Sequence, residues 1–303
     1  MKQSFSQIGF IGMGVMGEPM CRNLALKSGF SVVGFDRDAA PMQRLKAQGV
    51  KAASSVQEVV SGSDVVFLSL PSGEVVADVA RAANGVLAAV RPGAIIVDLS
   101  TSAVDTTRTL AREFSERGAI FIDAPVARTR AAAEAGTLSV MVGGDKAVFD
   151  KVHPLIATFA SEITLCGPVG SGQVLKILNN MILFQIGQVI AEAKVIGERA
   201  GVDPVLLFDT LSKGSADSFA LRNHGMKAML PGDFPERAFS VLYARKDLSY
   251  GLKLAEEAGI DSKRARDVDA LFAQAIESQL GEQYWPVISR LIEARALAIK
   301  KVH

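Results

Sequence analysis

The stretch Ile8-Gly9-Phe10-Ile11-Gly12-Met13-Gly14-Val15-Met16-Gly17 decides the fold of the first half of this chain. An apolar strand runs directly into G-x-G-x-x-G, so the glycines permit a sharp turn and a close approach of the backbone to a pyrophosphate. The helix that follows offers free amides and the positive end of its dipole to that negative charge. Asp36 ends a second apolar run, nineteen residues after Gly17, where a ribose-binding acid is expected. The pattern predicts a dinucleotide site at Gly12, Met13, Gly14, Val15, Met16, Gly17 and Asp36.

Apolar runs alternate with helical segments through the first half of the chain, which predicts an α/β, doubly wound Rossmann-type sheet of parallel strands with crossover helices. Several runs are apolar throughout, as expected when helices cover both faces of the sheet. Seven strands are expected, at residues 7–11, 31–36, 64–70, 94–99, 119–123, 138–142 and 162–165. Leu70, Pro71, Ser100 and Thr101 follow two of these runs, at the sheet edge where open α/β sheets bind ligands.

The strand pattern stops near Gly167, and the remaining chain has helical spacing. We therefore predict a dinucleotide-binding domain at residues 1–167 and an all-helical substrate and oligomerisation domain at residues 168–303. A long helix from Gln173 to about Ala200, ended by Gly201 and Pro204, is expected to join them. Its apolar residues lie on more than one face, which favours a homodimer or homotetramer.

The bulk composition favours small-molecule chemistry in a globular protein. The 303 residues are 49% hydrophobic and carry a formal net charge of +1, without a basic block that would favour nucleic acid or an anionic membrane. Polar and charged residues within the long helix argue against a membrane span, and the early first strand leaves no room for a signal peptide. Cys21 and Cys166 form no disulfide framework or metal-ligand spacing, which suits the cytoplasm. The three scattered histidines, His153, His224 and His303, are interpreted as structural or exposed, and no metal site is expected.

The start of the long helix carries the candidate catalytic group. In the segment from Gly170 to Asn180, Lys176 and Asn180 are four residues apart and share one helix face. Such residues are more often exposed than functional, but this helix begins at the predicted domain junction. A lysine that is partly desolvated there and close to an oxidised nicotinamide ring should have a lowered pKa and exchange a proton with a hydroxyl or carbonyl oxygen. Asn180, with Asn179, would orient the substrate.

The G-x-G-x-x-x-K-x-x-N-N segment and the N-terminal IGFIGMGVMGEPM together resemble the β-hydroxyacid dehydrogenase family, typified by 3-hydroxyisobutyrate dehydrogenase and tartronate semialdehyde reductase. The resemblance covers nearly the whole chain. It implies NAD- or NADP-dependent hydride transfer on a short acid that bears a 3-hydroxyl or an aldehyde, with Lys176 as acid or base. It also implies that Lys246, in the K-D-L of residues 246–248, reaches the dinucleotide.

The substrate loop departs from the family pattern. Ala127, Arg128 and Thr129 stand where the family usually has Ser-Gly-Gly, and Ala132 replaces another glycine. The Arg128 guanidinium can bind an anion through two parallel hydrogen bonds, or it can point to solvent. This loop is similar to that of sulfolactaldehyde reductases, although Leu183 is apolar where that subgroup has a serine. A sulfonate-ended aldehyde is therefore an alternative substrate.

The sequence leaves open the choice between NAD and NADP and two other kinds of protein. Asp36 favours NAD because a carboxylate repels the 2′-phosphate of NADP, whereas Arg37 could pair with that phosphate. A non-catalytic dinucleotide-binding module and an imine reductase are alternatives of other kinds. Lys176 argues against both, since a protein without dehydrogenase chemistry is expected to lack a lysine there.

Overall fold

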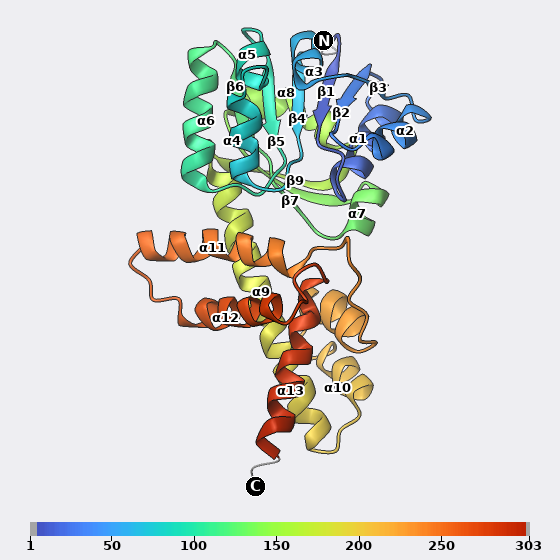
Figure 1. The fold of residues 1–303 in the computed structure, drawn as a ribbon, viewed down its shortest axis with the longest axis vertical. Helices are drawn as coiled ribbons and strands as arrows, with labels where there is room; N and C mark the ends of the chain where they lie inside the picture. Colours follow the sequence, from blue (N-terminus) through green and yellow to red (C-terminus); the bar gives the residue numbers. More distant parts are fainter. Residues whose placement is uncertain (1–4, 301–303) are drawn as a thin grey trace. The chain divides into compact units, whose positions relative to one another are not determined.

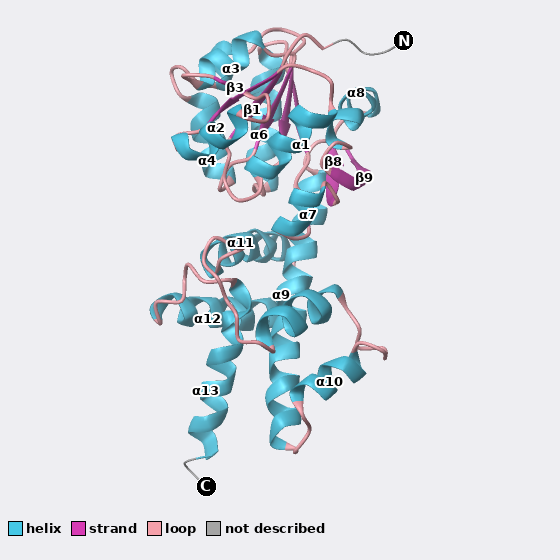
Figure 2. Ribbon diagram, turned by 90° about the vertical axis from the view of Figure 1, so that its right-hand side faces the viewer, coloured by secondary structure: helices cyan, strands magenta, loops and turns pink. Residues whose placement is uncertain are grey.

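A computed structural model describes residues 5–300, and the chain divides between Lys176 and Ile177 into two compact units. The first unit contains all the strands in the described residues, and the second consists of helices and loops (Figure 2). The predicted domain boundary lies at Gly167, nine residues before this division. The first residues of helix α9 (Ser171–Arg199) belong to the first unit, where the amides of Gly170, just before the helix, and of Gln173 donate to Asp123 of the sheet.

The first unit is built around one twisted sheet (Figure 1). The strand order is β3-β2-β1-β4-β5-β6-β8-β7, with β9 paired to β8, and strands β1 to β6 are parallel. This is the doubly wound arrangement expected from the sequence. The strands are β1 (Ile8–Ile11), β2 (Val32–Phe35), β3 (Lys51–Ala52), β4 (Val65–Leu68), β5 (Ile95–Asp98), β6 (Ile120–Asp123), β7 (Val126–Ala127), β8 (Leu138–Gly143) and β9 (Ala160–Gly167).

Two details of the predicted sheet were wrong. The described residues form nine strands instead of seven, because β3 and β7 are only two residues long, too short for hydrophobic periodicity to detect. The sheet is also mixed, since β8 is antiparallel to β6 and β7. Only ten residues connect β7 to β8, fewer than a parallel crossover connection requires.

Helices cover both faces of this sheet. Along β1 and β4, Ile8, Phe10 and Phe67 belong to one hydrophobic cluster, whereas Val66 and Leu68 belong to another on the opposite face. Successive side chains of a strand point to opposite faces, so strands that are apolar throughout are buried on both sides, as predicted. The helices are α1 (Gly17–Lys27), α2 (Ala39–Lys46), α3 (Val56–Gly62), α4 (Gly73–Arg81), α5 (Val86–Ala89), α6 (Val104–Glu116), α7 (Arg130–Ala135) and α8 (Lys146–Ile156).

The second unit is helical, as predicted, and its described residues add only two isolated β-bridges. Helix α9 begins two residues before the predicted start and ends before Gly201, whose φ is +86°, with Pro204 at the first turn of the next helix. The other helices are α10 (Pro204–Leu211), the π-helix η1 (Leu221–Met229), α11 (Val241–Glu257), α12 (Lys263–Glu277), the 3₁₀ helix η2 (Trp285–Val287) and α13 (Ile288–Lys300).

Trp285 lies at the centre of the second core. Its ring contacts Phe184 of α9 edge to face, with 5.2 Å between the ring centroids, and a Cβ at Gly187 would lie 2.3 Å from the same ring. Among the described residues, α9 is the one helix whose length and composition would allow it to cross a membrane. A core helix of a globular unit passes the same test, and Phe184, Ile190 and Ala191 are buried here.

Candidate functional site

The glycine-rich loop has the backbone that the sequence predicts for a dinucleotide cradle. Gly12 has a φ of +94°, and a Cβ there would lie 2.2 Å from the carbonyl oxygen of Ser69. A Cβ at Gly17 would lie 2.0 Å from the carbonyl oxygen of Gly12, whereas Gly14 faces open space. No side chain caps the start of α1, so its first amides keep their capacity to bind an anion. The loop therefore fits a pyrophosphate.

Asp36 follows β2 and organises the same loop. One carboxylate oxygen accepts a hydrogen bond from the amide of Met13, and the other accepts from the amide of Asp38 at 2.8 Å. A carboxylate has about four acceptor positions, so capacity remains for ribose hydroxyls. Met13 is buried, Val15 and Arg37 are exposed, and Met16 lies between these extremes.

The ends of β4 and β5 bring the other predicted cofactor residues together. The amide of Leu70 donates to Ser100 Oγ at 2.9 Å, so the segments that contain Leu70 and Pro71 and Ser100 and Thr101 are joined. The amide of Ser100 and the hydroxyl of Ser102 both donate to the carboxylate of Asp98. Burial raises the pKa of Asp98 to about 6, although these hydrogen bonds oppose the shift.

The predicted substrate loop departs from the family pattern in its backbone as well as in its sequence. Arg128 has a φ of +87° at a position where the family has glycine, so a bulky residue adopts a backbone that glycine prefers. Its Nη1 donates to the carbonyl oxygen of Thr137 at 2.6 Å and to Ser161 Oγ at 3.1 Å. Thr129 caps α7 through its hydroxyl, and Ala127 is buried in β7. Arg128 is exposed, but its guanidinium is bound to its own loop instead of being surrounded by solvent.

The start of α9 is fixed to the sheet by Asp123. Its Oδ1 accepts from the amide of Gly170 at 2.7 Å, and its Oδ2 accepts from the amide of Gln173 at 2.8 Å. Burial raises the pKa of Asp123 to about 6, and these amides oppose the shift. A Cβ at Gly172 would lie 2.2 Å from the carbonyl oxygen of Met141, so the helix start packs closely on β8. The turn that contains Lys176 therefore begins at a fixed position.

Lys176 and Asn180 occupy one buried face of α9, as their spacing predicts. Their exposed fractions are 8% and 1%, whereas Asn179 is exposed. Asn179 Nδ2 donates to Asn180 Oδ1 at 3.1 Å, and Asn180 Nδ2 donates to Asp247 Oδ2 at 2.6 Å. Asp247 thus fixes which end of the Asn180 amide is the donor.

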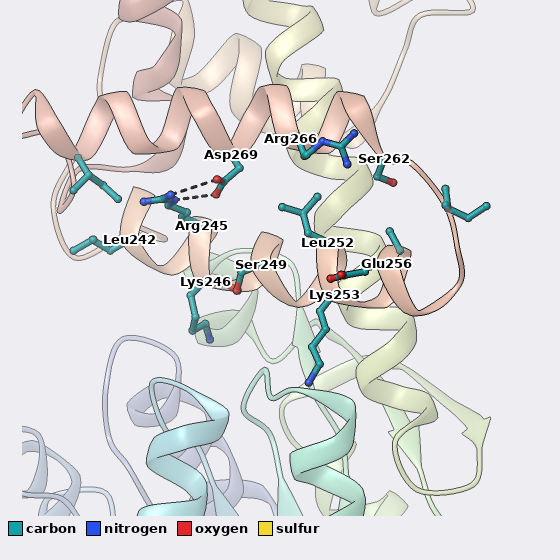
Figure 3. A pocket seen from close by; sticks show the side chains of 13 residues that line it. Leu242, Arg245, Lys246, Ser249, Leu252, Lys253, Glu256, Ser262, Arg266 and Asp269 are labelled. Atoms are coloured by element: carbon teal, nitrogen blue, oxygen red, sulfur yellow. Dashed lines mark hydrogen bonds and ion pairs between the residues drawn. The ribbon is translucent and has the colours of Figure 1, made fainter.

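Lys246 lies beside Asp247 within the second unit. Its Nζ is 2.9 Å from Asp247 Oδ1, an ion-pair distance, although the oxygen is buried without a hydrogen bond of good geometry. Lys246 also borders an open groove of about 790 Å³ between α11 and α12, which Asn180 and Asp247 do not line. Figure 3 shows Lys246 and Lys253 extending from α11 on the side away from Asp269, which pairs with Arg245.

Sequence reasoning missed the buried polar residues that support these groups. Asp98, Asp123 and Gln173 were not predicted as site residues, and Asp247 appeared only as a neighbour of Lys246. A strand that ends in an acid is a weak signal, and it becomes informative only when the pairing of β5 with β6 places Asp98 opposite Asp123.

Among the described residues, no group of three His, Cys, Asp or Glu side chains could hold a metal ion. His224 is buried and His153 is partly buried, while His303 lies outside the described residues. Cys21 is buried and Cys166 is half-buried, and both are free thiols.

A Rossmann sheet with a glycine-rich dinucleotide loop, followed by a helix with a buried lysine and asparagine, defines an NAD(P)-dependent oxidoreductase. Residues 7–167 match the model of the NAD-binding domain of 6-phosphogluconate dehydrogenase, and residues 170–286 match that of the NAD-binding domain of NADP-dependent 3-hydroxyisobutyrate dehydrogenase. The chain belongs to the β-hydroxyacid dehydrogenase family.

Three known proteins illustrate this membership. The chain is 37% identical to 2-(hydroxymethyl)glutarate dehydrogenase of Eubacterium barkeri over 84% of both chains. It is 34% identical to 2-hydroxy-3-oxopropionate reductase of Escherichia coli over 88% of this chain and 90% of that one. The structure of Mycobacterium tuberculosis 3-hydroxyisobutyrate dehydrogenase with L-serine has a TM-score of 0.85 and 29% identity, covering 95% of this chain and 99% of that one. None of these findings favours a non-catalytic module.

Proposed function

We propose that this protein transfers a hydride between NAD(H) and a short 3-hydroxy acid or its semialdehyde, with Lys176 as the proton donor or acceptor. The observation that carries the proposal is the burial of Lys176 and Asn180 on one face of α9, directly after a turn that Asp123 fixes to the Rossmann sheet. Lysine is among the residue types that are least often buried, so its burial beside Asn180 is informative.

The residues of this chain divide the chemistry between them. NAD(H), when bound, supplies or accepts the hydride at the substrate carbon. In reduction, the ammonium of Lys176 donates a proton to the developing alkoxide, and in oxidation its neutral amine removes the hydroxyl proton. The Asn180 amide, held by Asp247, orients the substrate oxygen, and Asn179 supports Asn180.

The preference for NAD over NADP belongs to the same proposal. Asp36 presents a carboxylate in the loop that would hold the adenosine ribose, and a 2′-phosphate there would be repelled. Lys246 is proposed to reach the dinucleotide from the second unit.

The substrate class follows from the relatives, and the loop selects within it. Three relatives are named for 2-(hydroxymethyl)glutarate, 2-hydroxy-3-oxopropionate and 3-hydroxyisobutyrate. Each of these compounds is an acid that carries a hydroxyl or an aldehyde on the carbon β to a carboxylate. We assign recognition of the acid group to Ala127, Arg128 and Thr129. Because Nη1 of Arg128 is bound to its own loop, the other guanidinium nitrogens are the ones available to an anion.

The test is an initial-rate panel with NADH and NADPH against succinic, tartronic and methylmalonic semialdehydes and sulfolactaldehyde. Lys176→Ala should lower kcat by about 10²-fold or more while leaving the Kd for NADH within a few-fold, since positioned proton transfer contributes about that much. Lys151→Ala, at an exposed position of α8, is the matched control. Equal kcat in parent and Lys176→Ala would remove Lys176 from the mechanism, and turnover of sulfolactaldehyde alone would assign the sulfonate.

A homo-oligomer and a cytoplasmic location complete the proposal. Ile182, Val189 and Ile196 are exposed on α9 at intervals of seven residues, so they form one aliphatic stripe that a second copy could cover. Val189→Glu should shift the mass measured by light scattering toward the monomer. The free thiols of Cys21 and Cys166 are compatible with a reducing compartment.

A further inference from the structure

Gln173 joins two parts of the first unit that the proposed function uses separately. Its side chain is fully buried at the first turn of α9. Its Nε2 donates to the carbonyl oxygen of Ser100 at 2.8 Å, and its Oε1 accepts from the amide of Ser102 at 3.0 Å. One carboxamide therefore links the helix to the loop that follows β5.

Two acids on neighbouring strands anchor both ends of this link. Asp98 accepts from the amide of Ser100 at 2.9 Å and from the hydroxyl of Ser102 at 3.0 Å. Asp123 accepts from the amide of Gln173 itself at 2.8 Å. Asp98 and Asp123 are register partners in β5 and β6, so the loop and the helix turn are both held to the same edge of the sheet.

The linked segments contain the groups that must cooperate in hydride and proton transfer. Ser100 and Thr101 are proposed to line the cofactor, and Ser100 Oγ also receives the amide of Leu70. Lys176 lies three residues after Gln173, about one helical turn further along α9. A shift of the helix turn relative to the loop would therefore change where Lys176 stands with respect to the cofactor.

We propose that Gln173 is a positioning residue that sets the turn of α9 carrying Lys176 against the Ser100–Ser102 loop. The inference rests on the proposed function. The side chain of Gln173 is fully buried and both ends of its carboxamide are hydrogen-bonded, so it would act through the helix turn and not by contact with substrate or cofactor. Both partners are backbone groups of a buried loop, which need a partner in the folded protein. Misplacement of a catalytic group by about 1 Å can cost about 10²-fold in rate.

The experiment compares Gln173→Met, which keeps the length of the side chain but removes both hydrogen bonds, with Gln173→Asn, which keeps the carboxamide but is too short to reach both partners. Val152→Ala, in the buried core of the same unit, controls for loss of stability without loss of the link. The measurements are kcat and its pH profile, the Kd for NADH, the urea midpoint, and hydrogen exchange of the protein without ligand. Both Gln173 variants are measured in parallel, so that failure of one to fold leaves the other decisive.

We expect both variants to lower kcat by tenfold to 10²-fold, with the Kd for NADH within threefold of the parent value. The limb of the kcat profile that depends on Lys176 should be displaced, which is the basic limb in reduction and the acidic limb in oxidation. Exchange should accelerate at residues 100–103 and 170–176 together. Val152→Ala should lower the urea midpoint without moving the pH profile. Equal losses of kcat in the Gln173 variants and Val152→Ala at equal midpoints, with an unmoved profile, would overturn the proposal. A parent without turnover would defeat the proposed function instead, and exchange at the two segments would still decide whether Gln173 links them.

Discussion

Asp98 gives the first unit a pH dependence of stability opposite to that of an ordinary surface acid. Burial raises the pKa of Asp98 from its ordinary value of 3.8 to about 6, and the charge of Asp123 adds to the shift. The native state thus binds the proton more tightly than the unfolded state. The free energy of unfolding therefore decreases as the pH rises from about 4 to about 6. Above that range Asp98 is ionised in both states, and its contribution no longer changes with pH. A difference of about two pKa units corresponds to about 3 kcal/mol.

Asp98→Asn removes this dependence while keeping the shape of the side chain. The stability of the variant relative to the parent should be about 3 kcal/mol more favourable at pH 7 than at pH 4. Comparison of one variant at two pH values cancels most changes in hydrogen bonding that are the same at both. Asp98 and Asp123 are register partners, so the measured steps belong to the pair.

Urea unfolding at pH 4 to 7 measures the effect, with an expected relative shift in midpoint of about 1 to 3 M. Far-UV circular dichroism follows both units, whereas fluorescence of Trp285, the single tryptophan, follows the second unit. Asp64→Asn is the matched control. Burial raises the pKa of Asp64, but hydrogen bonds from Ser6 outweigh it and leave the pKa below its ordinary value. The contribution of Asp64 to stability is therefore lost as the pH falls, opposite to that of Asp98. Parallel pH curves for Asp98→Asn and the parent would refute the reasoning.

Three further outcomes follow from the structure. Gly12→Ala should raise the Kd for NADH at least tenfold in a fluorescence titration, because the left-handed backbone costs about 1 to 2 kcal/mol with a Cβ and the methyl would lie 2.2 Å from Ser69 O. A Kd unchanged by this substitution would show that the loop does not approach the cofactor. Arg128→Gly should leave the melting temperature nearly unchanged, since relief of a positive φ offsets two exposed hydrogen bonds, while raising the KM of the preferred acid more than it lowers kcat. An unchanged KM for carboxylate and sulfonate substrates would restrict Arg128 to its own loop. Burial lowers the pKa of His224 to about 4, so the unfolded state binds its proton first and the second unit should lose about 3 kcal/mol as the pH falls from 6.5 to 4. His224→Gln should flatten that acid limb in Trp285 fluorescence, and an identical limb in the variant would assign it elsewhere.

The sequence predicts those parts of the fold that depend on local pattern. Continuous apolar runs identify the central parallel strands, and glycine spacing with Asp36 identifies the cradle loop, because close backbone approach requires glycine wherever it occurs. Strands β3 and β7 escape prediction because pairing with a neighbour, not apolar content, makes them strands. The reversal of β8 also depends on tertiary pairing.

The supporting residues of the site depend on contacts between distant parts of the chain. Gln173 reaches a loop 71 residues earlier, and Asp123 receives an amide 50 residues later, so no local spacing reveals either. The positive φ of Arg128 was equally invisible, although the family glycine at that position was a clue. Asn180 was predicted from helical spacing, but its partner Asp247 lies 67 residues away.

The division of the chain inside α9 has a consequence for any attempt to separate the two halves. A fragment that stops at Gly167, where the last strand ends, would remove the amides of Gly170 and Gln173 and leave the carboxylate of Asp123 without these two donors. Such a fragment is expected to dissolve poorly or to require added peptide, whereas one that continues through Lys176 retains its own helix start.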